Sequence, residues 1–128
     1  MTQEDNELLL KDLCARLPYG VKVKLGDNPN IFDLEYRIKF AVMYGDSDKL
    51  EDILDITNIK PFLFPLSSMT DEQEAEYDAT FETIVYEDGR KDSVMTYKSF
   101  DWLNKNHFDY RDLIPMGLAE DVTGLNIY

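Results

Sequence analysis

Residues 21–25 (VKVKL) and 32–42 (FDLEYRIKFAV) are the part of the chain that decides the fold. In both segments apolar side chains alternate with charged ones, and the residues between them, 26–30 (GDNPN), are typical of a turn. Because successive side chains of a strand point to opposite faces, this pattern predicts a β-hairpin with one buried face and one charged face.

The charges on the outer face of this hairpin are complementary. Lys22 and Lys24 lie on the first strand, and Asp33 and Glu35 lie on the second, so opposite charges can pair across the ladder. The second run is longer than the usual strand of about five or six residues, which predicts that it bends or extends beyond its partner and leaves a free edge. The residues at that edge are Tyr36, Ile38 and Phe40.

The N-terminal segment predicts an amphipathic helix. Thr2 or Asp5 can cap its start, and Arg16 and Pro18 mark its end. Four residues of the predicted buried face recur at three- and four-residue spacing: Leu10, Leu13, Cys14 and Leu17. On that face we expect Cys14 to be a buried packing thiol rather than a nucleophile.

The acidic middle of the chain predicts a helix followed by a second hairpin. Thr70 and Gln73 form a capping-box pattern, so a helix should begin after Met69. Two segments, 80–87 and 92–97, then flank Asp88 and Gly89, a dipeptide suited to a tight hairpin turn.

Three other apolar segments complete the core. Residues 59–66 (IKPFLFPL) contain two prolines and predict a buried irregular segment or an edge strand. Ser99 can cap a helix that carries aromatic residues, Phe100, Trp102 and Phe108 among them. A second C-terminal helix, limited or kinked by Pro115, is expected to carry these residues: Leu113, Ile114, Met116 and Leu118.

These elements predict one acidic α+β domain over residues 1–128. It has an N-terminal helix, an antiparallel sheet of two hairpins and C-terminal helices packed on one face of the sheet. The aromatic group near residues 100–110 is expected to be core, because no basic residues surround it as they would in a base-stacking surface.

The charge balance excludes several classes of protein. The chain has 26 acidic and 13 basic residues, a net charge of −13, and a sequence pI near 4.3. That sign opposes direct binding to nucleic acid and docking on an anionic membrane. A single cysteine, an acidic N-terminus and no long apolar run favour a cytoplasmic protein without disulfides.

Motifs for a cofactor or metal are missing from the sequence. The six glycines form neither a phosphate-binding loop nor a dinucleotide fingerprint. Asp46 and Asp48 match the first and third positions of a calcium loop. Leu50, however, has no oxygen ligand, and Glu51 stands where the loop requires glycine. We therefore predict no cofactor and no metal.

His107 is the only imidazole, so it cannot form a two-histidine metal site. Asp109 and Asp112 lie close in sequence, which leaves open an acid–base group oriented by a carboxylate. Without a nucleophile motif, a helix-end histidine that forms local hydrogen bonds is the favoured interpretation. The sequence therefore predicts that the protein is not an enzyme.

The second half of the chain holds most of the negative charge. Residues 71–92 carry nine acidic side chains against Arg90 and Lys91, a local net charge of 2 − 9 = −7. Such a surface can serve solubility alone, or it can compete for a basic groove that normally holds RNA or DNA. The candidate partner-binding residues are Asp71, Glu72, Glu74, Glu76, Asp78, Glu87 and Asp88.

Some parts of the sequence resemble known proteins. The stretches are 8–23 (LLLKDLCARLPYGVKV), 59–70 (IKPFLFPLSSMT), 100–118 (FDWLNKNHFDYRDLIPMGL) and 123–128 (TGLNIY). Together they resemble a family of short, largely uncharacterised proteins encoded by phages and mobile elements of gut-type anaerobic bacteria. The resemblance implies a mobile-element origin but no catalytic residue, and it does not extend to residues 27–58 or 71–98.

Two functions remain open at this point. The leading hypothesis is a non-enzymatic, phage-type inhibitor or regulator that binds a host nucleic-acid-handling protein, such as an RNA-guided nuclease, through the acidic face. The alternative is a structural or assembly module that self-associates through the edge of the first hairpin.

Overall fold

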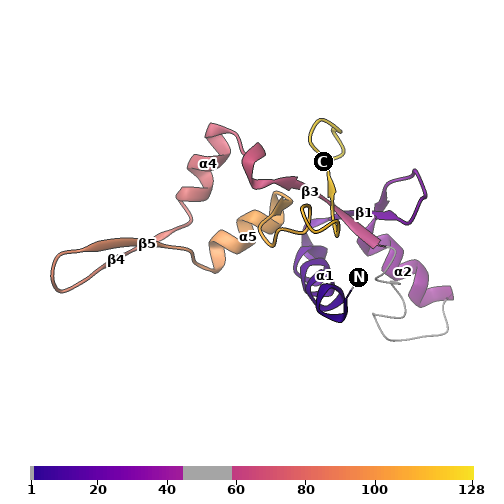
Figure 1. Ribbon diagram of the computed structural model, residues 1–128, viewed down its shortest axis with the longest axis horizontal. Helices are drawn as coiled ribbons and strands as arrows, with labels where there is room; N and C mark the ends of the chain where they lie inside the picture. Colours follow the sequence, from indigo (N-terminus) through magenta and orange to yellow (C-terminus); the bar gives the residue numbers. More distant parts are fainter. Residues whose placement is uncertain (1, 45–58) are drawn as a thin grey trace.

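The computed structural model describes residues 2–44 and 59–128. It is an elongated α+β molecule, as the sequence predicts, with the main sheet at one end and a separate hairpin projecting at the other (Figure 1). The elements are α1 (Gln3–Arg16), η1 (Leu17–Tyr19), β1 (Lys22–Leu25), β2 (Phe32–Asp33), α2 (Leu34–Tyr44), β3 (Ile59–Pro65), η3 (Leu66–Ser68), α4 (Asp71–Asp78), β4 (Glu82–Val85), β5 (Lys91–Val94), α5 (Tyr97–Lys105), β6 (Phe108–Asp109) and β7 (Glu120–Asp121).

Helix α1 begins after Thr2, one of the two predicted caps, and its buried face is rotated from the predicted one: Leu13 is buried, while Leu10 and Leu17 are only partly buried against the core. The Thr2 hydroxyl accepts from the Asp5 amide at 3.1 Å, and the Asp5 carboxylate accepts from the Thr2 amide in return. The buried residues are Leu9, Asp12, Leu13 and Arg16. Cys14 is exposed, so the prediction of a buried thiol is wrong. The stripe is rotated because Asp12 and Arg16 form an ion pair and can be buried together.

The first hairpin forms, but its second strand is short. Phe32 pairs with Val23 and Asp33 with Lys22 in an antiparallel register. The Lys22 ammonium lies 3.0 Å from the Asp33 carboxylate, which confirms this predicted cross-strand charge pair. The chain then enters helix α2 at Leu34, so the prediction of one long strand over residues 32–42 is wrong.

The sequence of α2 satisfies a helix as well as a strand. Leu34 and Ile38 are four residues apart, so both periods place them on one face; Leu34 is buried and Ile38 packs on the core. Only the helix turns Tyr36 away from that face, and Tyr36 is 64% exposed. An ion pair of 3.0 Å between Glu35 and Lys39, also four residues apart, further stabilises the helix.

Strand β3 lies in the middle of the main sheet, whose order is β2-β1-β3-β6, with β7 also paired to β3. It runs antiparallel to β1 and parallel to β6 and β7. The prediction of an edge strand or irregular segment is therefore wrong. The prolines are tolerated because pairing with β7 starts at Phe62, after Pro61, and because Pro65 is the last residue of the strand.

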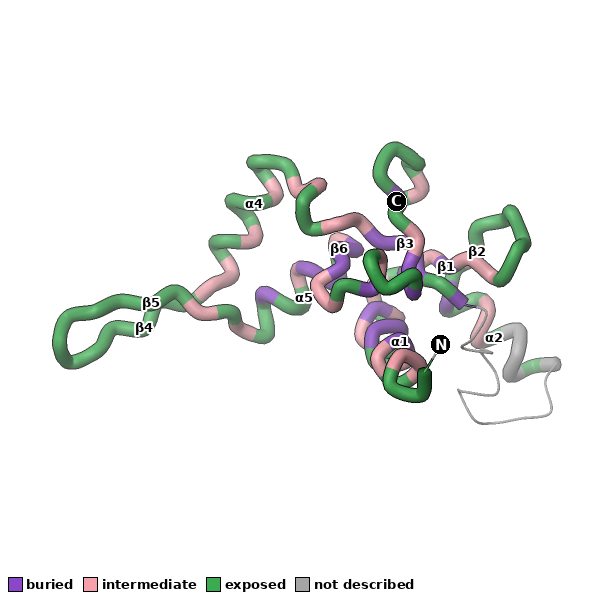
Figure 2. The backbone as a smooth tube through the Cα atoms, in the orientation of Figure 1, coloured by how far each residue is buried: buried purple, intermediate pink, exposed green. Residues whose placement is uncertain are grey.

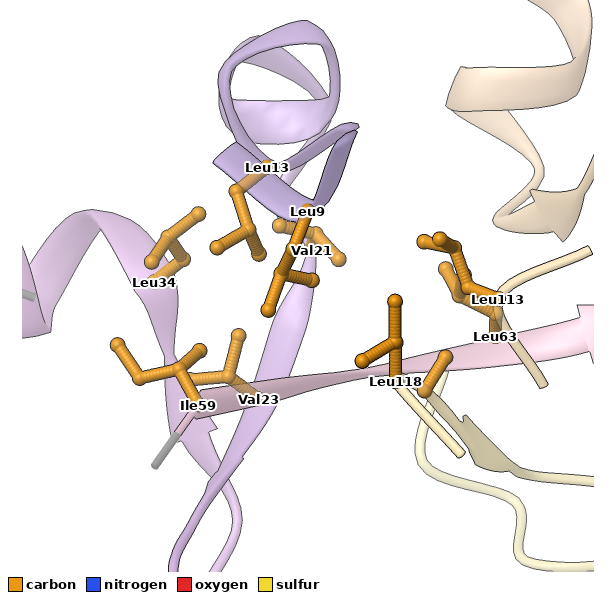
Figure 3. Packing of buried hydrophobic residues seen from close by; sticks show 10 residues of the cluster. Leu9, Leu13, Val21, Val23, Leu34, Ile59, Leu63, Leu113 and Leu118 are labelled. Carbon is orange, nitrogen blue, oxygen red and sulfur yellow. The ribbon is translucent and has the colours of Figure 1, made fainter. Parts of the chain in front are cut away.

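The core lies between α1 and one face of this sheet (Figure 3). Figure 3 shows Leu9 and Leu13 of α1 directed toward Val21, Val23 and Ile59. The buried hydrophobic cluster consists of Leu9, Leu13, Val21, Val23, Leu34, Ile59, Leu63, Leu113, Leu118 and Ala119. Burial of this apolar surface is the main favourable contribution to folding.

The second hairpin also forms, but it belongs to a sheet of its own rather than to the main sheet. Thr96, not Ser99, is the N-cap of α5, and Ser99 completes its capping box. The predicted second C-terminal helix is absent, because residues 113–117 form turns instead. The Asp109 carboxylate accepts from the Leu113 and Ile114 amides and holds this turn in place.

Candidate functional site

The candidate site is the projecting part of the molecule, residues 71–95, which we call the acidic arm. It comprises α4 and the β4–β5 hairpin, and Figure 2 shows that most of its residues are exposed. Apart from Tyr77, Phe81 and a few partly covered neighbours, its side chains are turned to solvent.

Helix α4 carries five of the predicted contact residues. The Thr70 hydroxyl accepts from the Gln73 amide at 3.1 Å, and the Gln73 side chain accepts from the Thr70 amide at 2.9 Å, which confirms the predicted capping box. Gln73 and Tyr77 form the half-buried face of the helix. The exposed carboxylates on the remaining surface are Asp71, Glu72, Glu74, Glu76 and Asp78. Those in the first turn are stabilised by the helix dipole.

The other two predicted contacts, Glu87 and Asp88, lie at the tip of the hairpin. The turn is closed by the Tyr86 amide, which donates to the Arg90 carbonyl at 2.8 Å, and Gly89 adopts the positive φ of 86° that the turn requires. The Asp88 carboxylate accepts from the Arg90 guanidinium at 2.7 Å, so part of its charge is neutralised locally.

The structure therefore separates the seven predicted contacts into two groups. Five lie on the exposed surface of α4, while Glu87 and Asp88 lie at the far end of the hairpin (Figure 1). The hairpin contributes additional exposed apolar side chains, which the sequence analysis did not single out. They are Ile84, Val85, Tyr86 and Met95.

A row of aromatic rings holds the arm against the body of the protein. Tyr77 of α4 packs edge-on against Phe81, with ring centroids 5.1 Å apart, and its ring is tilted by 36° against that of Trp102 in α5 at 5.5 Å. Trp102 in turn stacks on Phe108 of β6, with ring centroids 5.6 Å apart and planes 7° apart. Packing of the predicted aromatic group therefore links the acidic helix to the main sheet, although Phe100 at its margin is 43% exposed.

Hydroxyl groups hold the base of the hairpin, a role that the sequence analysis missed. The Thr96 hydroxyl donates to the Thr80 carbonyl at 3.0 Å, and the Thr80 hydroxyl donates to the Ser99 hydroxyl at 2.8 Å. Thr96 also accepts from the Lys98 amide as the cap of α5. Thr96 and Ser99 are both of a residue type that caps helices, which signals a helix start in this region, but their link to Thr80 depends on the fold.

His107 lies outside the arm, directly after the cap of α5, in a left-handed conformation with φ of 63°. Its backbone amide donates to the Asn104 carbonyl, but its buried Nδ1 has no hydrogen-bond partner within residues 2–44 and 59–128. The local hydrogen bond expected of a helix-end histidine is therefore formed by the backbone amide of His107 and not by its Nδ1. Burial, and then the charges of Arg16 and Lys22, lower the pKa of His107 to about 4.

The carboxylate nearest in sequence to His107 is engaged elsewhere. Both oxygens of Asp109 accept backbone amides, at 3.0 Å from Leu113 and 2.9 Å from Ile114. Asp112 is exposed. Neither residue hydrogen-bonds to the imidazole, so the arrangement does not resemble a carboxylate-oriented acid–base pair.

A buried ionic cluster lies beside His107. The Arg16 guanidinium donates to Asp12 at 2.8 Å and to the Phe108 carbonyl at 2.6 Å, and Arg111 lies 3.4 Å from Asp12. Arg16 and Arg111 also lie over the Tyr110 ring. Burial raises the pKa of Asp12 despite the opposing charge of Arg16. These contacts join α1 to the C-terminal segment and are structural.

The residues predicted to form a self-associating hairpin edge do not form that edge. Tyr36, Ile38 and Phe40 belong to α2 rather than to a strand, so they present no free hairpin edge. The candidate calcium ligands Asp46 and Asp48 lie outside the described residues, and within those residues no group of three or more His, Cys, Asp or Glu is placed to hold a metal ion. Across the same residues, none of the helices is long and apolar enough to cross a membrane.

Comparisons with known proteins do not assign the fold or the arm. No protein-family model, no curated protein and no solved structure matches the chain.

Proposed function

We propose that the protein is a non-enzymatic inhibitor or regulator that binds the cationic groove of a nucleic-acid-handling protein through its acidic arm. An RNA-guided nuclease of the cytoplasm is a partner of the right chemistry, because its channel is positively charged and tracks a phosphate backbone. The phage and mobile-element origin implied by the sequence resemblance is consistent with such a target.

The observation that carries this proposal is the position of the charge. The carboxylates of α4 surround a helix that projects from the body, and residues 71–92 as a whole have a net charge of −7. A rigid negative surface of this kind steers a cationic partner toward it and competes with nucleic acid for the same groove. The aromatic row from Tyr77 to Phe108 supports the required rigidity.

The proposal is tested with a panel of purified RNA-guided nucleases and other nucleic-acid-binding enzymes. We expect the protein to slow target cleavage by at least one of them, with binding that weakens as salt increases. A variant in which the seven acidic contacts are replaced by amides should lose this inhibition while its circular dichroism spectrum is unchanged. Inhibition that persists in that variant, or a panel with no bound member, contradicts the proposal.

A further inference from the structure

Strands β4 and β5 form a sheet of only two strands. Each pairs with the other through the register Glu82 with Val94 to Val85 with Lys91, and neither pairs with another strand of the described chain. Isolated two-stranded hairpins are only marginally stable in water, and a third strand stabilises them strongly. Both outer edges of this sheet are therefore open to strand addition.

The backbone geometry identifies which groups are free on the β4 edge. The Tyr86 amide donates to the Arg90 carbonyl and so points toward β5. Because the polar groups of alternate residues in a strand point to the same side, Thr83 and Val85 direct their N–H and C=O groups away from β5. Throughout residues 59–128, no hydrogen bond to these outward groups is formed.

The apolar side chains of the hairpin are also uncovered. Ile84 is 42% and Val85 63% exposed, although they lie on opposite faces of the two-stranded sheet. Edge strands that are protected against pairing are usually covered or carry charges that point inward. This hairpin instead leaves apolar surface on both faces, where the alternating side chains of an added strand can pack.

Charge distinguishes the two edges and selects the occupant. Residues 71–89 contain no Lys or Arg, and Glu82, Glu87 and Asp88 lie on or next to β4. Strand β5 instead begins at Lys91, directly after Arg90. A second copy of this chain would bring another arm of net charge −7 against the first, so a basic segment fits the β4 edge better.

We propose that the outer edge of β4 binds an extended, lysine-rich segment of the partner protein as a third strand of the β4–β5 sheet. This inference rests on the proposed function, since it specifies how the acidic arm holds its cationic partner. Hydrogen bonds to Thr83 and Val85 supply the affinity, and the carboxylates around them select for lysine. The Thr80–Thr96 contact holds the base of the hairpin and reduces the entropy lost on binding.

The test uses a synthetic peptide of alternating lysine and valine, together with a twin that is N-methylated at every residue, because methylation of alternate residues would block only one of the peptide's two edges. The twin has the same charge but cannot complete the backbone ladder. We expect the unmodified peptide to bind at least about tenfold more tightly, which corresponds to a few backbone hydrogen bonds. Binding is measured by fluorescence anisotropy of the labelled peptide.

Thr83 and Ser93 provide a matched pair of variants, because they face each other in the hairpin and both direct their amides outward. Thr83→Pro removes a donor from the β4 edge, and Ser93→Pro removes one from the β5 edge, without touching the hydrogen bonds between the strands. We expect Thr83→Pro to lose about tenfold in peptide affinity and Ser93→Pro to retain it. The reverse order would overturn the choice of edge.

Hydrogen exchange of the unmodified protein gives an answer that does not depend on the folding of the variants. Peptide binding should slow exchange at the Thr83 and Val85 amides and leave the Ser93 amide unchanged. Equal affinity of both peptides would overturn strand addition while leaving charge-driven binding, and thus the proposed function, intact. Failure of both peptides to bind, or a dimer through β4 detected by light scattering, would also overturn strand addition. The proposed function is tested separately, by the panel of nucleases.

Discussion

The phenol ring of Tyr128 stacks on the imidazole of His107, with centroids 3.6 Å apart and planes 11° apart. The Tyr128 hydroxyl accepts from the Lys22 amide and donates to the Phe62 carbonyl, both at 2.8 Å. Since Lys22 lies in β1 and Phe62 in β3, this one hydroxyl bridges the two central strands of the main sheet. The last residue of the chain is therefore part of the sheet's hydrogen bonding.

We predict that Tyr128→Phe destabilises the fold by about 1–2 kcal/mol, because it leaves the Lys22 amide and the Phe62 carbonyl without their shared partner. The stack on His107 should survive, since the ring is retained. Chemical denaturation followed by circular dichroism measures the effect. Tyr97→Phe is the matched control, because Tyr97 is 71% exposed, and it should change the stability by less than about 0.5 kcal/mol.

The same hydroxyl predicts that the stability of the fold decreases at alkaline pH. Burial raises the pKa of Tyr128 to about 12 from an ordinary value of 10. Because the pKa is raised in the folded state, the contribution of the protonated hydroxyl to the free energy of unfolding is fully present below pH 10 and is lost as the pH rises toward 12. Titration of the Tyr128→Phe variant should therefore show a flatter alkaline limb than the parent protein. Identical alkaline limbs would mean that the hydroxyl is not buried between the strands.

His107 predicts a second pH dependence of stability: at acid pH, the stability of the fold decreases as the pH falls. Its pKa is lowered from 6.5 to about 4 by burial and by Arg16 and Lys22. The contribution of the neutral imidazole to the free energy of unfolding is therefore fully present above pH 6.5 and is lost as the pH falls through 4. Partial solvent screening limits the loss to about 2 kcal/mol. His107→Asn tolerates the left-handed backbone and should flatten this part of the stability curve.

Local signals in the sequence predict the elements that depend only on neighbouring residues. The capping box of Thr70 with Gln73 locates the start of α4 correctly, and Thr2, one of the two candidate caps, is the N-cap of α1. Asp88 and Gly89 locate the turn of the second hairpin. In each case the hydrogen bonds that fix the structure connect residues within about five positions, so the sequence alone contains the information.

The incorrect predictions concern residues whose environment is set by distant parts of the chain. The alternation over residues 32–42 fits a strand and a helix equally at Leu34 and Ile38, and packing against the core decides between them. The burial of Arg16 depends on the Phe108 carbonyl, 92 residues away. The candidate arm was found by its charge, but its division into two groups and its attachment through Trp102 required the fold.

The buried pair of Asp12 and Arg16 predicts an asymmetric response to mutation. Removing only the carboxylate with Asp12→Leu should cost about 3–5 kcal/mol, because Arg16 would remain buried without its counter-charge. Replacing both residues, as in Asp12→Leu with Arg16→Met, should recover much of that loss. Urea denaturation of the two single variants and the double variant measures the coupling. Additive losses would show that the two residues do not act as a pair.

The acidic arm predicts that the position of the charge matters more than its amount. Glu72, Glu74 and Glu76 can be changed to Gln, and the control variant changes Glu4 and Glu7 to Gln and Asp27 to Asn. Both variants have the same net charge, −13 + 3 = −10.

Screening in physiological salt restricts strong attraction to charges within about 8 Å of the partner. The α4 variant should therefore bind the lysine–valine peptide with an association rate about tenfold lower. The control should fall by no more than about twofold, because its exposed carboxylates lie outside the arm. Stopped-flow mixing measures both rates. Equal losses in the two variants would show that the total charge of the protein, rather than the arm, attracts the partner.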